Sequence, residues 1–469
     1  MKHTGKSLLK RLTEYHKTSV PMHMPGHKRN ALFLENGLPY KIDITEIDGF
    51  DNLHNLTGVL KETADLASKL YGSKKAFPLV NGSTCGILAS MYALASSGDK
   101  VLVARNCHKS VYNGIELLNL VPYYVVPETD ELGIFQKITP EAVENALKTH
   151  ENISLVILTS PTYEGVISDI SAISDVCRKY GAKLLLDAAH GAHLGLADGL
   201  EKNVCPAKSG ADVVVMSLHK TMPSLTQTAL LHICTDAVDE TKIKSALSIF
   251  ETSSPSYPLL ASIDLCIRTV IDNKEKLYGD FNKKLSSFYE NTKNLKNIKV
   301  SCFDDPSKII ISCDGVSGNT LSEILRKKYK IEVEMACPLY CLAITSICDS
   351  KKNFKRLKKA LFSMDKSLCR EERIVFKTLK EFNPEYCEIP SQAVKKQGEM
   401  VLIDDALGFE SLEYLWAYPP GIPLVVPGEI ITEDVLSLIN FYIQNGIPLY
   451  TTNSFDEKKI KVLKNNSLA

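Results

Sequence analysis

Short apolar runs alternate with amphipathic stretches between residue 58 and about residue 290. Apolar runs of this kind, bounded by polar residues, are typical of strands buried on both faces of a parallel sheet. The last run follows the previous one so closely that we predict it turns back and lies antiparallel to the others. The seven predicted strands span residues 76–80, 100–104, 122–127, 155–158, 182–187, 213–216 and 227–233.

Helical spacing of apolar residues fills most of the gaps between these strands. Thr139 is expected to cap the helix that follows it. Strands that alternate with helices predict an α/β fold with a seven-stranded, mainly parallel sheet. The predicted helices span residues 1–20, 63–71, 87–94, 139–149, 169–180 and 259–293.

The pattern changes near residue 295. Strands at 297–300, 308–312 and 342–345, with helices at 320–328 and 353–371, predict a small α+β domain. Farther on, a run with four prolines and two glycines at 418–429 predicts a rigid, extended backbone. We therefore predict an N-terminal arm, a large domain, a small domain and a C-terminal module, at residues 1–57, 58–295, 296–380 and 381–469.

Composition limits the classes of function. Lys plus Arg and Asp plus Glu each number 55 among 469 residues, so a net charge of zero argues against nucleic acid as an electrostatic partner. We see neither an 18-residue apolar span nor a signal sequence, which predicts a cytoplasmic protein without a membrane helix. The thirteen cysteines are expected to be free thiols. The densest set, Cys337, Cys341 and Cys348, matches no metal-binding spacing, so we predict no metal site.

The polar segment after the strand at 213–216 contains Lys220. Parallel α/β folds place catalytic loops at the carboxyl ends of strands. A desolvated lysine there favours its neutral amine, which can form a Schiff base with an aldehyde. Pyridoxal phosphate (PLP) is the aldehyde cofactor that uses such a lysine, although most lysines at strand ends are surface residues.

A second strand ends in Asp187, 33 residues before Lys220. PLP chemistry needs an acid opposite the pyridine nitrogen, because a protonated ring is a better electron sink. An aspartate after a strand is alone more often a helix cap. The two residues at successive strand ends favour the cofactor interpretation.

Residues 81–86 form a glycine-containing turn between a predicted strand and a predicted helix. The hydroxyl groups of Ser83 and Thr84, with backbone N–H groups at a helix N-terminus, can bind phosphate. We expect Gly82 to permit the tight turn and Gly86 a close approach of the backbone. A capped helix start is the commoner role of such a turn.

Four more residues lie at strand ends or loop edges of the same predicted sheet. Ser217 and His219 are expected to bind the cofactor phosphate, together with the turn at 81–86. His108 is either a histidine satisfied within its loop or a ring that stacks on a flat cofactor. Thr162 follows the strand at 155–158 and joins the predicted cofactor site.

Two loops near the N-terminus carry charged residues. His27 lies in a loop with two prolines and a glycine, which is either a binding loop or a solvated turn. Asp51 lies in an acidic segment at 43–54, for which a solvated loop is the alternative.

Together these motifs resemble those of the bacterial Orn/Lys/Arg decarboxylases, which are PLP-dependent enzymes of fold type I, the aspartate-aminotransferase-like fold. The resemblance runs from about residue 21 to residue 429 and is to the short members, which lack an N-terminal wing domain. The matching motifs are Met24-Pro25-Gly26-His27-Lys28, Asp43-Ile44-Thr45-Glu46, Asp51-Asn52-Leu53-His54, Asn81-Gly82-Ser83-Thr84, Asn106-Cys107-His108-Lys109-Ser110, Ser160-Pro161-Thr162-Tyr163-Glu164-Gly165, Asp187-Ala188-Ala189-His190-Gly191, Ser217-Leu218-His219-Lys220, Ser254-Pro255-Ser256-Tyr257 and the proline run that ends at Glu429.

The resemblance implies decarboxylation of a basic amino acid, arginine before lysine or ornithine, in polyamine biosynthesis. It implies a homodimer with active sites at the interface, where the loop at 252–254 reaches the partner's cofactor. By the same resemblance, Ser254 in this loop and His190 in the motif at 187–191 are expected to bind the cofactor. Glu429 is the first candidate for binding the cationic end of the substrate, with His27 and Asp51 as further candidates.

Some positions depart from the family pattern. Ala188 stands where glutamate is common, and residues 389–393 lack an arginine that many relatives carry. Residues 415–417, before the proline run, are also unusual. These departures bear on the identity of the substrate more than on the type of reaction.

We expect Lys220, His219, Asp187 and His108 to be catalytic, with Lys220 or His219 protonating the α-carbon. An aminotransferase or C–S lyase of the same fold would share the lysine and the aspartate. Such an enzyme would usually need an arginine for the substrate carboxylate, and none stands out in the small domain. A non-catalytic binding protein of this fold would not need Lys220.

Overall fold

The computed structural model describes residues 6–18, 25, 28, 38–197, 205–368, 386–418, 421–452 and 458–463. The chain divides into two compact units, each built from separate stretches of sequence. The first unit contains residues 1–94, 183–282 and 346–348, and the second contains 95–182, 283–345 and 349–469. The four domains expected from the sequence stay a prediction. His27 lies outside the described residues.

The largest sheet has seven strands in the order β1-β7-β6-β5-β4-β2-β3. This confirms the predicted number of strands and the mainly parallel character of the sheet. β7 is antiparallel to both β6 and β1, as its position in the sequence predicts. The strands are β1 (Lys75–Leu79), β2 (Lys100–Ala104), β3 (Val121–Val125), β4 (Ile153–Thr159), β5 (Lys183–Asp187), β6 (Val213–Ser217) and β7 (Ala229–Ile233).

The helices of the first unit begin and end at recognisable signals. α2 ends at Gly72, whose positive φ of 73° lets its N–H bond the carbonyl of Ser68. α8 begins after Asp239, whose side chain accepts the N–H of Thr241. The longer helices of this unit are α1 (Leu8–Thr18), α2 (Val59–Tyr71), α3 (Gly82–Leu94) and α8 (Glu240–Phe250), while α9 (Tyr257–Thr292) begins in the first unit and ends in the second.

The expectation for the start of α3 was wrong by five residues, since the helix begins at Gly82 and not at Ile87. Gly82 has a φ of +77°, so the chain turns directly from β1 into the helix. Gly86 does permit a close approach, but to the sheet. A Cβ there would lie 2.7 Å from Leu79 Cδ1 and 2.9 Å from Val215 Cγ1.

The segment around Lys220 also differs from the expected loop. It forms a single helical turn, α7 (Leu218–Thr221). The N–H of Met222 bonds the carbonyl of Leu218 at 2.8 Å, and the N–H of Leu218 bonds the carbonyl of Thr228 at 3.0 Å. The turn thus satisfies backbone groups just beyond a strand that is buried throughout.

In the second unit, three helices that follow strands of the large sheet are capped by side chains. His108 caps α4 (Lys109–Leu117), Thr139 caps α5 (Pro140–Thr149), and Asp169 caps α6 (Ile170–Lys179). The sequence predicted the second and third of these helices. It did not predict α4, which begins inside the polar motif 105–110.

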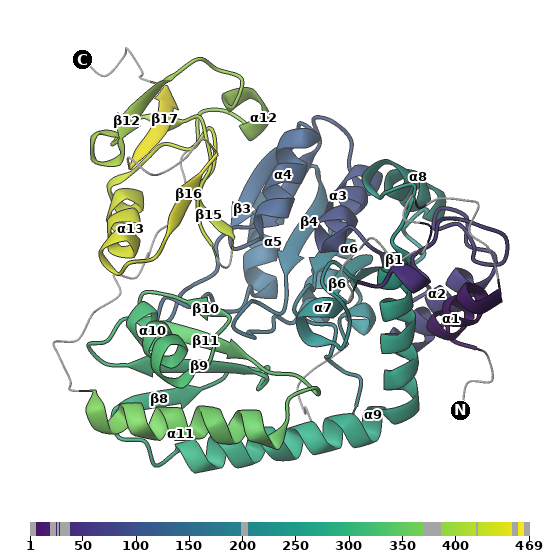
Figure 1. Cartoon of the computed structure of the whole chain (residues 1–469). Helices are drawn as coiled ribbons and strands as arrows, with labels where there is room; N and C mark the ends of the chain where they lie inside the picture. The colour runs from purple at the N-terminus through teal and green to yellow at the C-terminus, as the bar shows by residue number, and fades with distance from the viewer. Residues whose placement is uncertain are drawn as a thin grey trace. The chain divides into compact units, whose positions relative to one another are not determined.

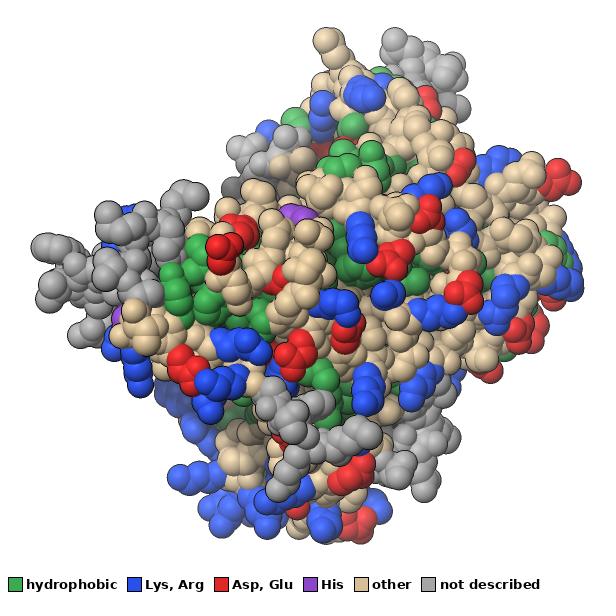
Figure 2. Space-filling model, turned by 90° about the vertical axis from the view of Figure 1, so that its right-hand side faces the viewer, with side chains coloured by type: hydrophobic (Ala, Val, Ile, Leu, Met, Phe, Trp, Pro, Cys, Tyr) green, Lys and Arg blue, Asp and Glu red, His purple; other side chains and the backbone are tan. Residues whose placement is uncertain are grey.

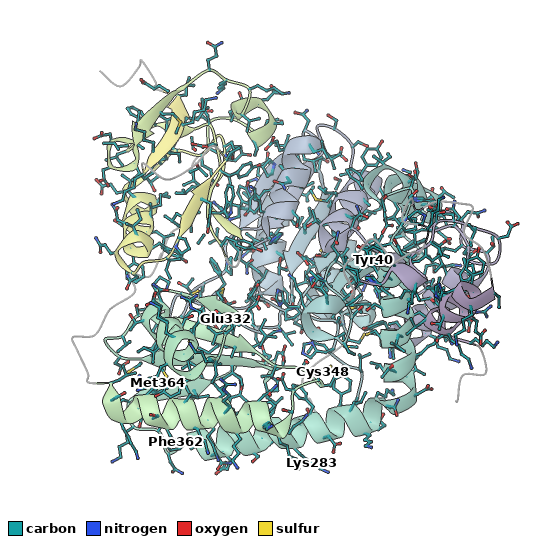
Figure 3. The ribbon with its side chains drawn as sticks, viewed as in Figure 1. Tyr40, Lys283, Glu332, Cys348, Phe362 and Met364 are labelled. Atoms are coloured by element: carbon teal, nitrogen blue, oxygen red, sulfur yellow. The ribbon has the colours of Figure 1, made fainter. Side chains whose placement is uncertain are left out.

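A four-stranded antiparallel sheet in the second unit has the order β10-β11-β9-β8. Helices α10 (Gly318–Tyr329) and α11 (Lys351–Ser367) lie beside it (Figure 1). Met364 on α11, labelled in Figure 3, is buried. The strands are β8 (Ile298–Ser301), β9 (Lys308–Cys313), β10 (Met335–Ala336) and β11 (Tyr340–Ile344).

The C-terminal segment of the second unit contains two three-stranded sheets, β12-β17-β13 and β15-β14-β16, with α12 (Pro390–Ala393) and α13 (Glu433–Gln444). Ile431, Ile439 and Leu415 are in its apolar core. The proline run contributes β15, so its extended backbone is paired in a sheet. The strands are β12 (Glu399–Leu402), β13 (Glu410–Ser411), β14 (Leu415–Ala417), β15 (Ile422–Val425), β16 (Leu449–Thr451) and β17 (Lys459–Leu463).

The distribution of surface charge and the state of the cysteines agree with what the composition predicts. The face in Figure 2 has basic and acidic side chains interspersed. The twelve cysteines in the described ranges are free, and Cys337 and Cys341 are buried. In the same ranges, His, Cys, Asp and Glu side chains form no group that could hold a metal ion. The described helices also include none that is long and apolar enough to cross a membrane.

Candidate active site

Two neighbouring strands bring the key residues of the first unit to one sheet edge. β5 and β6 are parallel, and Asp187 at the end of β5 pairs in register with Val215 of β6. Ser217 ends β6, and α7 with Lys220 follows at once. Parallel neighbours share their carboxyl edge, so the two strand ends deliver the acid and the amine to the same place.

Lys220 contacts a histidine from the turn after β5. Its Nζ lies 3.1 Å from His190 Nε2, and His190 is only 4% exposed. Asp187 is equally buried, and its Oδ1 accepts the N–H of Ala189 at 3.0 Å. Burial raises the pKa of Asp187, while the charge of Lys220 and the Ala189 N–H act in the opposite direction. The described residues that directly follow β5, 188–197, contain no helix, so Asp187 caps no helix there.

The side chain of His219 is fixed by a backbone carbonyl. Its Nδ1 lies 3.0 Å from the carbonyl oxygen of Thr228. A carbonyl oxygen can only accept, so Nδ1 carries a proton. In the neutral ring, Nε2 then holds the lone pair.

Two hydroxyl oxygens at this edge have no hydrogen-bond partner among the described residues. They are Ser217 Oγ and Thr221 Oγ1, and both side chains are buried. A buried hydroxyl group without a hydrogen-bond partner costs free energy. A bound ligand that accepts a hydrogen bond from each hydroxyl would offset this cost. The anionic oxygens of a phosphate group would accept from such hydroxyls.

The N-terminus of α3 belongs to the same unit. The N–H of Gly82 donates to the carbonyl of Gln227 at 2.9 Å, and the next residue, Thr228, accepts from His219. Ser83 and Thr84 are therefore in the first turn of a 13-residue helix that is tied to the loop before β7. A helix N-terminus favours an anion.

The residues of the first unit fit PLP. Lys220 supplies an amine, Asp187 a buried acid, and Ser217 an unsatisfied hydroxyl beside a helix N-terminus. These are the groups that the aldehyde, the ring nitrogen and the phosphate of the cofactor require.

Two further predicted residues of this unit have local roles. The carboxylate of Asp51 accepts the N–H of Gly58 at 2.7 Å, the N–H of Leu60 at 2.9 Å and two bonds from Thr57. It therefore holds the start of α2. Ser254 is exposed, and its N–H donates to Thr252 Oγ1 at 3.3 Å.

In the second unit, His108 and Thr162 each anchor a turn. The Nδ1 of His108 accepts the N–H of Ser110 at 3.1 Å. Gly421 lies against the ring, since a Cβ on that glycine would be 3.2 Å from the ring. Thr162 Oγ1 accepts the N–H of Val166 at 3.2 Å. The predicted contact of both residues with a cofactor stays a prediction.

Glu429 is buried with a strong partner. Its Oε2 accepts from Arg105 Nη2 at 3.1 Å and from the N–H of Val426 at 2.8 Å. Its Oε1 has no hydrogen-bond partner among the described residues. Burial raises the pKa of Glu429, and Arg105 and the Val426 N–H oppose this shift. One carboxylate oxygen is therefore anchored, while the other is buried without a hydrogen-bond partner among the described residues.

The sequence analysis missed Arg105 and the role of Gly428. Arg105 directly follows the buried strand β2, and a charge at that position is the signal that was available. Gly428 has a φ of +91°, and a Cβ there would lie 2.0 Å from the carbonyl oxygen of Glu388. The bend before Glu429 thus excludes every side chain.

Comparison with known proteins gives two family matches. Residues 6–310 match the Orn/Lys/Arg decarboxylase major domain, and residues 370–446 match the C-terminal domain of the same family. An arginine decarboxylase of Bacillus subtilis is 31% identical over 95% of this chain and 95% of its own length. An arginine decarboxylase of Halalkalibacterium halodurans is also 31% identical, over 95% of this chain and 94% of its own length.

Solved structures give the same fold. The Francisella novicida lysine decarboxylase LdcF has a TM-score of 0.80 at 21% identity and covers 98% of this chain and 81% of its own. The constitutive lysine decarboxylase of Escherichia coli has a TM-score of 0.77 at 20% identity, over 97% of this chain and 82% of its own. At such low identity these likenesses show the fold alone, which is PLP fold type I.

Proposed function

The chain belongs to the Orn/Lys/Arg decarboxylase family, and we propose that it removes the α-carboxyl group of arginine as CO₂, with PLP as cofactor. The observation that carries the proposal is the grouping of Lys220, His190 and Asp187 at the carboxyl edge of β5 and β6. When bound, PLP supplies an electron-withdrawing ring that accepts the electron pair left by the departing CO₂.

Different residues of the first unit are assigned to different parts of the cofactor. Lys220 Nζ is assigned to the aldehyde and Asp187 to the ring nitrogen. Ser217, His219 and the α3 N-terminus, with Ser83 and Thr84, are assigned to the phosphate. By resemblance, His108 and Thr162 are assigned to the ring, and Ser254 to the cofactor of the partner.

Proton transfer is assigned to groups close to Lys220. The 3.1 Å contact between Lys220 Nζ and His190 Nε2 allows a proton to pass between them. Loss of CO₂ is balanced by uptake of one proton at the α-carbon, which Lys220 or His219 delivers. The bond from His219 Nδ1 to Thr228 fixes the orientation of that ring.

Arginine is favoured over lysine and ornithine because the two relatives at 31% identity are named arginine decarboxylases. Glu429 is the proposed partner of the guanidinium group, since its Oε1 is available to a donor. His27 and Asp51 remain further candidates, although Asp51 already caps α2. By resemblance, we also propose a cytoplasmic homodimer that serves polyamine biosynthesis.

The test is to incubate the purified protein with arginine, lysine and ornithine while CO₂ and amine release are followed. We expect equal amounts of CO₂ and the amine, with arginine turned over fastest. A parallel incubation contains 2-oxoglutarate as an amino acceptor, and release of a keto acid derived from the substrate there would identify an aminotransferase. Absence of turnover in both incubations would favour a binding protein.

The lysine is tested by Lys220→Ala. We expect this variant to lose turnover and the visible absorbance of bound cofactor, since it lacks the amine that holds the aldehyde. Lys183→Ala, at the start of β5, is a matched control that should keep both. Retention of both signals by Lys220→Ala would refute the assignment.

A further inference from the structure

Four side-chain hydrogen bonds of Arg105 lie within the second unit. Its Nη1 donates to the carbonyl of Pro423 at 2.6 Å and to Tyr112 Oη at 3.1 Å. Its Nη2 donates to the carbonyl of Leu424 at 3.3 Å and to Glu429 Oε2 at 3.1 Å. The side chain is 3% exposed, so these bonds form in a medium of low polarity where they are strong.

The position of Arg105 follows from its neighbours in the chain. Its N–H bonds the carbonyl of Val125 at the end of β3, which fixes its backbone beside the sheet. Its guanidinium lies 5.5 Å from the ring centre of Tyr112 and 5.6 Å from that of Tyr124. Planar stacking with two rings and a forked donor set are properties of arginine that lysine lacks.

Arg105 is the one cation in the described part of the chain that lowers the pKa of Glu429. Among the described residues, the other titratable groups that interact with Glu429 are four tyrosines. Burial raises the pKa of each of them, so they are neutral at physiological pH. They are Tyr112, Tyr124, Tyr386 and Tyr414.

We propose that Arg105 is a positioning residue for substrate selection, which holds Glu429 ionised and leaves its Oε1 for the cationic end of the substrate. This inference rests on the proposed function. Arg105 binds only Oε2 and leaves Oε1 without a partner in the described residues. Its bonds to the carbonyls of Pro423 and Leu424 fix the strand that precedes Glu429. A carboxylate oxygen without a partner can accept a charge-assisted hydrogen bond from a cationic donor such as a guanidinium group.

The test compares Arg105→Gln with the wild type on two substrates, arginine and norleucine, whose side chain is linear but neutral. We expect kcat/KM for arginine to fall by about 100-fold and that for norleucine to change little, because only arginine uses Glu429. The acid limb of log kcat/KM for arginine should also move to higher pH, because removal of the Arg105 charge raises the pKa of Glu429. The absorbance of bound cofactor checks that both proteins are equally loaded.

Three further variants separate this role from a purely structural one. Arg105→Lys keeps the cation, so its acid limb should lie closer to that of the wild type. In Glu429→Gln, adding Arg105→Gln should not reduce the preference for arginine further. Arg268 is a matched control, since it is also a buried arginine, paired with Asp264 and Glu62 at 2.8 Å, and Arg268→Gln should leave the preference unchanged.

An equal loss on arginine and norleucine, or an unmoved acid limb, would overturn the role of Arg105 while leaving the decarboxylase assignment in place. A wild-type protein that turns over neither amino acid would refute the proposed function itself, and the role of Arg105 with it.

Discussion

Glu251 is a buried carboxyl group whose protonation bears on stability. Its Oε1 accepts the N–H of Val80 at 2.8 Å, and the residue is 7% exposed. Burial raises the pKa of Glu251 to about 7, with the Val80 N–H opposing the shift. The native state therefore binds a proton that the unfolded chain releases near its ordinary pKa of 4.5.

We expect Glu251→Gln to become more stable relative to the wild type as the pH rises. Below pH 4.5 the wild-type carboxyl is neutral in both states, and the difference between the proteins is constant. Between pH 4.5 and 7 the wild type loses stability on the order of 3 kcal/mol, because a charge must then be buried. Chemical denaturation of both proteins from pH 4.5 to 8 measures this difference. A difference that stays flat over that range would contradict the raised pKa.

At this scale the sequence predicted that Lys220 and Asp187 lie at neighbouring strand ends, which the structure confirms, but it did not predict the partners of the site residues. Lys220 and Asp187 could be found because strand ends in a parallel sheet converge. The pairing of Glu429 with Arg105 spans 324 positions in the chain, and no periodicity signals such a contact. For the same reason the sequence left Glu429 as a free acid, whereas one of its oxygens is anchored.

Gly86 in α3 and Gly279 in α9 are glycines within helices, but in opposite surroundings. A Cβ on Gly86 of α3 would lie within 3 Å of Leu79 and Val215, whereas a Cβ on Gly279 of α9 would meet nothing within 4 Å. The packing of α3 on the sheet therefore depends on the missing side chain.

We expect Gly86→Ala to lower the melting temperature, because the helix must move away from buried strands. Gly279→Ala should raise the free energy of unfolding by up to about 1 kcal/mol, since alanine favours a helix and finds room there. Thermal unfolding of the two variants beside the wild type is the measurement. A Gly86→Ala protein as stable as Gly279→Ala would show that the contact with β1 and β6 is loose.

The sequence predicted elements well where they are long and buried, as in the seven-stranded sheet. It failed in the C-terminal segment, where strands β13 and β14 have two and three residues. Such strands carry too few residues for a periodic pattern and form because partners far along the chain, such as β17 and β16, pair with them. The sequence analysis predicted no helix at α13, although Thr432 caps it and two acids follow in its first turn.

At the scale of the whole molecule, the family resemblance predicts that each active site takes a loop from a second copy of the chain. Two variants test this prediction, and each is expected to be inactive because it lacks a different part of the active site. Lys220→Ala keeps an intact loop at 252–254, and Ser254→Trp keeps an intact lysine.

We expect a purified hybrid of these two variants, formed by coexpression with different affinity tags, to regain on the order of half the wild-type activity. In the hybrid one of the two sites combines a wild-type lysine with a wild-type loop. Light scattering should give twice the chain mass of 51.9 kDa. A hybrid as inactive as its parents would mean that the loop serves its own subunit.

Gly428 has a consequence for how related genomes are searched. The carbonyl of Glu388 occupies the place of any side chain at that position, so even a methyl group would displace the bend that sets Glu429. A chain that retains every charged and hydroxyl-bearing motif residue but has alanine at 428 would pass a motif search as intact. We would class such a chain among degenerate copies. The substitution disrupts the main chain, although every reactive side chain is still present in the sequence.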